Sequence, residues 1–87
     1  MQTQAYFILL LLRDYPLDSN RLKEELLHSS YFNDVEDVDS WLEKLTIKNW
    51  IENKEDNYFI TPKGLKELLN RESLNLVRYN SSRKKIN

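Results

Sequence analysis

The segment from Trp50 to Thr61 constrains the fold most, because two short apolar and aromatic runs flank a polar centre. β-Branched and aromatic residues favour strands and polar residues favour turns, so the segment predicts a β-hairpin with Asp56 and Asn57 at its tip. Thr61 and Pro62 then predict the start of a helix, since a threonine hydroxyl caps a first turn in which proline loses no needed amide. The chain therefore combines one small hairpin with helices.

The first helix is predicted over about residues 3–14 and includes the apolar run AYFILLLL at residues 5–12. Its apolar side chains cover so much of the circumference that it needs partners on two sides. A homodimer formed through the first and last helices would supply one of these partners. The run is too short to cross a membrane, which takes about 20 apolar residues, and it lacks the flanks of a signal peptide.

Two further helices before the hairpin follow from apolar residues at spacings of three and four. Asp18 is placed to cap the second helix, and Asn33 or Asp34 to cap the third, with Glu36 completing a capping box. The predicted inner faces consist of Leu22, Leu26 and Leu27 in the second helix and Val35, Val38, Leu42 and Leu45 in the third. Trp41 is expected at the edge of the core.

The segment over residues 42–69, LEKLTIKNWIENKEDNYFITPKGLKELL, resembles the recognition helix, wing and following helix of PadR-type and MarR-type regulators. In those families a Leu-x-x-Leu pair precedes a glycine, two apolar residues, a short wing and a Tyr-x-Leu-Thr-x-x-Gly motif. The matching residues here are Leu42, Leu45, Trp50, Ile51, Tyr58, Ile60, Thr61 and Gly64. Asn49 replaces the first glycine and is expected to adopt the same left-handed conformation. The resemblance implies a mainly α fold with a small β-hairpin, as a winged helix-turn-helix over residues 1–79. Residues 80–87 are polar and basic and are expected to form a flexible tail.

Such a fold implies a small transcription regulator that binds double-stranded DNA, with the third helix in the major groove and the wing against the backbone. The candidate DNA-binding residues are Ser40, Lys44, Lys48, Lys54, Asn57, Lys63, Arg83, Lys84 and Lys85. The net charge of −1 is the sum of two opposite charges, because residues 1–60 carry a net charge of −6 and residues 61–87 carry a net charge of +5. The basic end is expected either to contact phosphates or simply to keep the chain soluble.

The third helix is unusually acidic for a DNA-binding helix. The candidate acidic interaction surface consists of Glu36, Asp37, Asp39 and Glu43, and three of these acids recur on one helical face. Because phosphate repels carboxylates, an alternative function is an adaptor or inhibitor, encoded by a phage or mobile element, that binds a basic protein and no DNA. The same charges also suit a solvated face, since the helix dipole favours negative charge at an N-terminus.

The residue inventory argues against catalysis. The chain has no cysteine and one histidine, His28, which is expected on the surface at a helix C-terminus. No serine stands in a nucleophile motif, and the acids lack the loop spacing of a calcium site. We therefore expect no enzymatic activity, no metal, no cofactor and no membrane partner, and the absence of cysteine suits a reducing cytoplasm.

Overall fold

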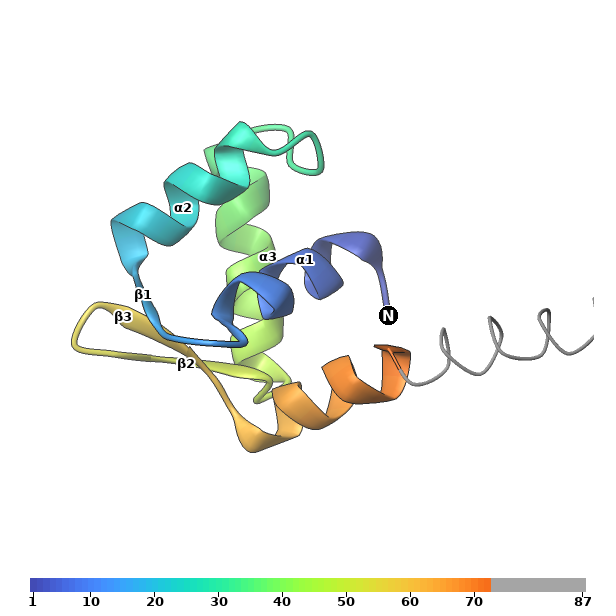
Figure 1. Ribbon diagram of the computed structural model, residues 1–87. Coiled ribbons are helices and arrows are strands. Elements are labelled where there is room, and N and C mark those ends of the chain that lie inside the picture. Colours follow the sequence, from blue (N-terminus) through green and yellow to red (C-terminus); the bar gives the residue numbers. More distant parts are fainter. Residues whose placement is uncertain (73–87) are drawn as a thin grey trace, which may run out of the picture.

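The computed structural model describes residues 1–72, so the predicted tail and the candidate residues Arg83, Lys84 and Lys85 lie outside the described part. In chain order the elements are α1 (Thr3–Leu12), β1 (Leu17–Asp18), α2 (Ser19–His28), α3 (Val35–Ile47), β2 (Ile51–Lys54) and β3 (Asn57–Ile60) (Figure 1). A further helix begins at Pro62 and is called the Pro62 helix. The described chain is thus mainly helical, with a three-stranded antiparallel sheet in the order β1-β3-β2.

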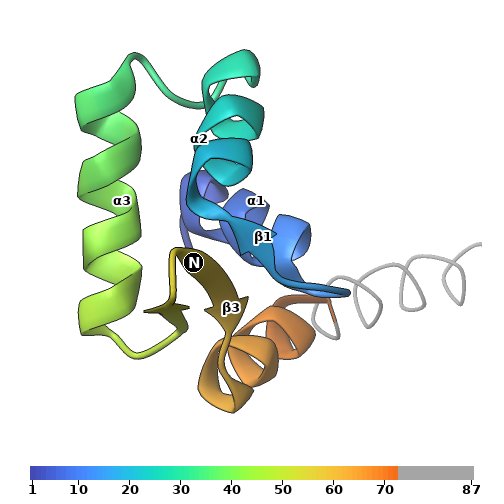
Figure 2. The same ribbon diagram turned by 90° about the vertical axis from the view of Figure 1, so that its left-hand side faces the viewer.

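The core lies where the three numbered helices, the Pro62 helix and the sheet meet. Its largest fully buried side chains are Ile8, Leu9, Leu12, Leu22, Leu26, Val38, Leu45, Ile51 and Leu68. Phe7, Leu10 and Leu11 pack against this core from the flanks of α1, as expected for a helix that is apolar around most of its circumference. Figure 2 shows α3 along one edge of the molecule, with α1 and α2 together on its inner side.

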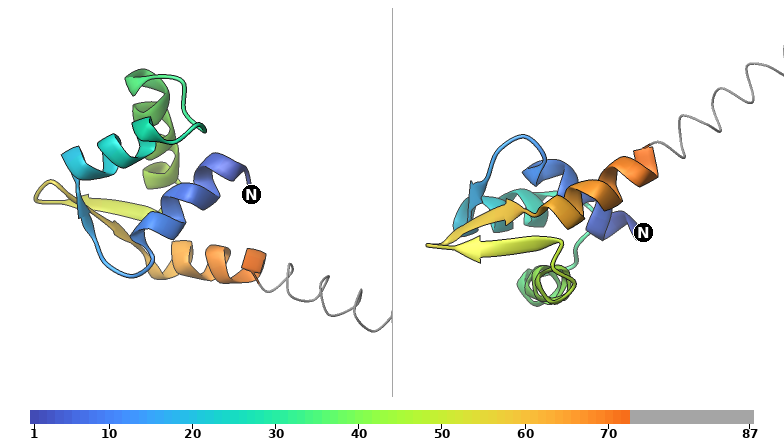
Figure 3. Two further views of the ribbon diagram at one scale, coloured as in Figure 1. Left: turned by 45° about the horizontal axis from the view of Figure 1, so that its top comes forward. Right: turned by 90° about the horizontal axis from the view of Figure 1, so that it is seen from below.

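The Pro62 helix runs beside α1, and Figure 3 shows the two helices next to each other in both views. Arg13 Nη1 lies 3.3 Å from Glu72 Oε1, which joins the two helices by an ion pair. The Arg71 guanidinium lies 4.5 Å from the centre of the Tyr6 ring. Part of the flank of α1 is therefore covered within one chain. α1 also ends at Leu12, two residues before the predicted end.

Side-chain caps fix the starts of α2 and α3. The predicted Asp18 cap is confirmed, because Asp18 Oδ1 accepts a hydrogen bond from the Arg21 amide at 2.9 Å. At α3 the cap is Asp34, whose Oδ1 accepts from the Asp37 amide at 2.8 Å. Asp37 completes the capping interaction. The predicted role of Glu36 was wrong, because Glu36 stands only two residues after Asp34. In a capping box the returning side chain comes from the third residue after the cap.

The sheet differs from the prediction in two ways. β1 was not predicted, yet Leu17 pairs with Tyr58 and adds a third strand. The hairpin tip is Glu55 and Asp56, with φ of 51° and 68°, and not Asp56 and Asn57. Asn57 instead pairs with Lys54 as the last rung of the ladder. Two consecutive positive φ angles are typical of the two-residue type I′ turn, whose twist matches that of the strands.

Two apolar side chains predicted to face inward, Leu27 and Val35, are exposed, and so is Leu69 of the Pro62 helix. Leu27 is 39% exposed and Leu69 is 50% exposed, whereas their neighbours Leu26 and Leu68 are fully buried. Adjacent helical residues differ by about 100° in direction, so Leu27 and Leu69 lie at the edge of the buried face that Leu26 and Leu68 occupy. Val35 is 52% exposed because it is the first residue of α3, one turn before Val38. The predicted inner faces were therefore too wide.

α3 ends in a Schellman motif that turns the chain directly into the hairpin. Asn49 adopts φ 63°, which confirms its predicted left-handed conformation. Its amide donates to the Thr46 carbonyl at 3.0 Å, and the Trp50 amide donates to the Leu45 carbonyl at 3.0 Å. These two bonds are the pair that defines the motif.

Thr61 joins this turn to the Pro62 helix through three hydrogen bonds, which we call the Thr61 latch. Its Oγ1 donates to the Asn49 carbonyl at 2.6 Å and accepts from the Gly64 amide at 3.0 Å. Its backbone amide donates to the Trp50 carbonyl at 3.0 Å. The predicted helix cap is thus confirmed, and the same side chain also ties together the two ends of the hairpin.

Replacing Asn49 tests the left-handed turn. We expect Asn49→Gly to leave the free energy of unfolding unchanged or slightly higher, because glycine adopts positive φ freely. Asn49→Ala should lower it by about 1 kcal/mol, the usual cost of a β-carbon in this conformation. Urea unfolding followed by circular dichroism measures both. Equal stabilities of the glycine and alanine variants would contradict the assigned turn.

Candidate functional site

α3 presents one side that faces away from α1 and α2 (Figure 2). The sequence places Glu36, Ser40 and Glu43 on this side, because positions three, four and seven apart share a helical face, and all three are exposed. Ile47, one turn further along, is 76% exposed. The side is therefore open to a partner and carries both carboxylates and an apolar group.

The acidic row, defined as Glu36, Asp39 and Glu43, lies on the exposed part of α3. Asp39 Oδ1 is 3.2 Å from Lys23 Nζ of α2, so one of the three charges is partly balanced. Asp37, the fourth predicted acidic residue, is half-buried, and its Oδ2 accepts a hydrogen bond from the Asn33 amide at 3.0 Å. Asp37 thus belongs to the cap of the helix rather than to the acidic row.

The opposite flank of α3 carries two lysines that lie over tryptophan rings. Lys44 Nζ is 4.6 Å from the centre of the Trp41 ring, and Lys48 Nζ is 4.7 Å from that of Trp50. Trp41 and Lys44 are brought together by their spacing of three within one helix. Trp50 reaches Lys48 because the Schellman motif folds the chain back after Asn49.

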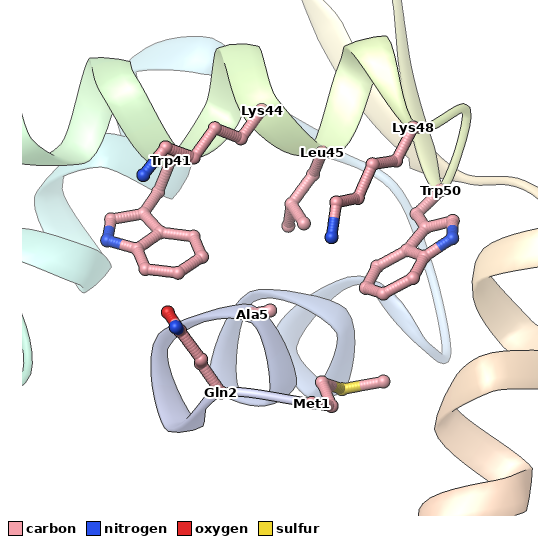
Figure 4. A pocket seen from close by; sticks show the side chains of 8 residues that line it. All are labelled: Met1, Gln2, Ala5, Trp41, Lys44, Leu45, Lys48 and Trp50. Carbon is pink, nitrogen blue, oxygen red and sulfur yellow. The ribbon is translucent and has the colours of Figure 1, made fainter.

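These side chains border a pocket of about 530 Å³ between α3 and the start of α1. The residues lining it are Met1, Gln2, Ala5, Trp41, Lys44, Leu45, Lys48 and Trp50. Figure 4 shows the two indole rings at the two ends of the pocket and the Lys48 ammonium pointing into the space between them. The Lys44 ammonium lies over the outer end of the Trp41 ring, away from Lys48. The pocket therefore combines flat aromatic walls with one inward positive charge.

The candidate DNA-binding residues among residues 1–72 are dispersed over the molecule. Lys44 and Lys48 border the pocket near the N-terminus, whereas Lys54 and Asn57 belong to the hairpin, whose tip lies on the other side of the molecule in Figure 1. Lys54 Nζ lies 3.7 Å from Glu52 Oε1, so its charge is partly balanced. The remaining candidates in this part of the chain, Ser40 and Lys63, are exposed on α3 and on the Pro62 helix.

The sequence patterns do not predict this pocket. The expectation that Trp41 packs at the edge of the core is confirmed, because it is half-buried against core residues, but its second role was not foreseen. The sequence predicts Trp50 as a flank of the hairpin and as an apolar position of the regulator motif, without a role in a pocket. The spacing of Trp41, Lys44 and Lys48 along one helical flank was a usable signal. Nothing local in the sequence indicates that Gln2 and Ala5 of α1 close the other side.

Within residues 1–72, no group of three histidine, aspartate or glutamate side chains is arranged to hold a metal ion. No helix in this part of the chain has the length and apolar content needed to cross a bilayer. Comparison of the chain with protein-family models, curated proteins and solved structures finds no match.

Proposed function

We propose that this chain is a winged helix-turn-helix protein that binds double-stranded DNA and acts as a transcription regulator in the cytoplasm. The observation that carries the proposal is the order of elements: an exposed helix α3, packed on α2, is followed at once by a hairpin and another helix. A small strand between α1 and α2 completes the sheet in the order β1-β3-β2. In DNA-binding folds of this type the exposed helix enters the major groove.

The charges restrict how DNA would be bound. The acidic row would meet phosphates unfavourably, so the main contacts should come from basic groups around it. Lys44 lies in the C-terminal half of α3, Lys48 is its C-cap residue, and Lys54 lies on the hairpin. The basic residues after residue 72 would add to them. We therefore propose weak, strongly salt-dependent binding, with the N-terminal half of α3 turned away from the phosphates.

Titration of random-sequence duplex DNA tests this proposal, using the anisotropy of a labelled duplex at several salt concentrations. We expect log K to fall with log salt with a slope of about −3, which corresponds to three or four neutralised phosphates. Lys44→Gln should reduce the slope by about 1, because the Lys44 ammonium forms no ion pair among residues 1–72. Lys23→Gln is the matched control, because the Lys23 ammonium is already paired with Asp39. Absence of binding even at low salt would contradict the proposed DNA binding.

A second candidate function rests on the exposed side of α3. Here the acidic row lies between two exposed apolar residues, Val35 at 52% and Ile47 at 76% exposure. Carboxylates around apolar anchors suit a basic protein partner, which is the function of an adaptor or inhibitor. The triple variant Glu36→Gln, Asp39→Asn, Glu43→Gln separates the two candidates. It should raise DNA affinity if α3 faces DNA and leave it unchanged if α3 serves a protein partner.

Two copies of the chain would meet through α1 and the Pro62 helix in the proposed homodimer. Leu69 supports this arrangement, because it is half exposed on the Pro62 helix beside α1. The flanking residues Phe7, Leu10 and Leu11 of α1 are also only partly buried within one chain. Sedimentation equilibrium at tens of micromolar distinguishes the dimer from a monomer.

A further inference from the structure

We propose that the pocket between α3 and the start of α1 binds unpaired bases of single-stranded nucleic acid. This inference goes beyond the proposed function, because it concerns a single strand and does not depend on duplex binding. The pocket has a volume of about 530 Å³ and contains both tryptophans of the chain, Trp41 and Trp50. Small molecules occupy pockets of about 300–1,000 Å³, so this one has room for a base but not for a duplex.

The two indoles supply surfaces on which bases can stack. Both rings are only half-buried, and they line the pocket at its two ends (Figure 4). Proteins that hold single strands place aromatic side chains along a basic groove, and bases of any sequence stack on these rings. The Trp50 amide donates to the Leu45 carbonyl at 3.0 Å, which fixes Trp50 relative to α3. This wall is therefore preformed, which lowers the cost of binding.

Each indole of the pocket is accompanied by a positive charge. Lys44 Nζ lies 4.6 Å from the centre of the Trp41 ring, and Lys48 Nζ lies 4.7 Å from that of Trp50. A single strand offers the complementary pair, a planar base and a phosphate, at every nucleotide. The two lysines are one helical turn apart. The pocket therefore suits two successive nucleotides of one strand.

The charges of the pocket favour a nucleic acid over other partners. None of the lining residues is acidic, and among residues 1–72 neither Lys44 nor Lys48 forms an ion pair. A quaternary ammonium group also binds over indole faces, but the two lysine ammonium groups would repel it. An acidic peptide would neutralise the lysines, but its carboxylates would not stack on the indoles. A strand satisfies both the rings and the charges.

A duplex cannot use the indoles in the same way. Its bases are paired and stacked inside, so a protein meets only groove edges and the backbone. Gln2 and Ala5 of α1 close the pocket opposite α3 (Figure 4). A base must leave the base stack to enter a pocket of this kind. Only an unpaired base can therefore stack between α1 and α3.

The test is a titration of the full chain with oligothymidylate of about sixteen nucleotides, followed by the indole N–H signals in two-dimensional NMR spectra. The chain has only two tryptophans, so both indole signals report on the pocket. We expect both to shift saturably. An abasic strand of the same length, which keeps the phosphates and lacks the bases, should bind about tenfold or more weakly. Oligouridylate of the same length distinguishes RNA from DNA as the source of the strand.

Trp41→Leu should remove most of the preference for oligothymidylate over the abasic strand, because leucine fills space without offering a ring. Tyr15→Leu is the matched control and should retain the preference. Tyr15 is also an aromatic residue, is 62% exposed and lies outside the pocket. The comparison of the two strands on the unmodified chain remains decisive even if Trp41→Leu lowers stability.

Equal affinities of the unmodified chain for oligothymidylate and the abasic strand would overturn the proposal. So would indole shifts that persist undiminished after complementary oligoadenylate has paired all the bases, since phosphates alone would then cause them. Binding of a polyglutamate peptide of the same charge as tightly as the strand would assign the pocket to an acidic protein segment, which also overturns the proposal.

Discussion

Gly64→Ala is expected to lower the free energy of unfolding by about 3 kcal/mol, although alanine is ordinarily the better helix former. A β-carbon at position 64 would fall well inside the contact distance of the Trp50 carbonyl oxygen and 2.9 Å from its carbon. That carbonyl cannot move away without loss, because it accepts a hydrogen bond from the Thr61 amide at 3.0 Å within the Thr61 latch. The overlap must therefore be relieved by separating the Pro62 helix from the turn after α3.

Urea unfolding followed by circular dichroism measures this loss. Lys66→Ala is the matched control, because Lys66 is exposed on the same helix, and its replacement should change stability by less than about 0.5 kcal/mol. Propensity alone predicts that Gly64→Ala stabilises the protein, so the two explanations differ in sign. A Gly64→Ala protein as stable as the unmodified chain would show that the Pro62 helix does not approach Trp50 as described.

The features predicted well from the sequence are those that depend on interactions between residues close together in the chain. Asp18, Asn49 and Thr61 each act on backbone groups within a few residues, and each has the predicted capping role or backbone conformation. β1 escaped prediction because it has only two residues and exists through pairing with β3, about 40 residues later. The one-residue shift of the hairpin tip has the same origin, since the register is set by cross-strand pairs such as Ile51 with Ile60.

The two flanks of α3 differ in the same way: one depends on the sequence of the helix itself, and the other depends on contacts with a distant segment. The acidic row could be read from helical spacing, because exposure of Glu36 and Glu43 follows once Val38 and Leu42 are buried. The pocket could not be read in this way. It requires the start of α1 to approach the end of α3, and these segments are separated by most of the domain in sequence. Apolar periodicity identifies a buried face but not the element that covers it.

Leu9→Ala should destabilise the protein by about 3 kcal/mol, the usual cost of deleting a fully buried leucine side chain. Leu9 has no exposed surface and belongs to the core shared by α1 and its neighbours. Removal of its methyl groups loses apolar burial and leaves a cavity that backbone relaxation fills only in part. Thermal and urea unfolding of the full chain both measure the change.

Ile47→Ala is the matched comparison, because it also truncates a large aliphatic side chain in a helix. Ile47 is 76% exposed on α3, so little burial is lost, and alanine favours the helix slightly more than isoleucine. Its stability should therefore change by less than about 0.5 kcal/mol. A large loss for Ile47→Ala would show that Ile47 is covered in solution, and a concentration-dependent loss would assign the cover to a second copy of the chain. Leu9→Ala thus measures how much a buried core side chain contributes to stability. Ile47→Ala measures independently whether the exposed side of α3 is uncovered in the isolated protein.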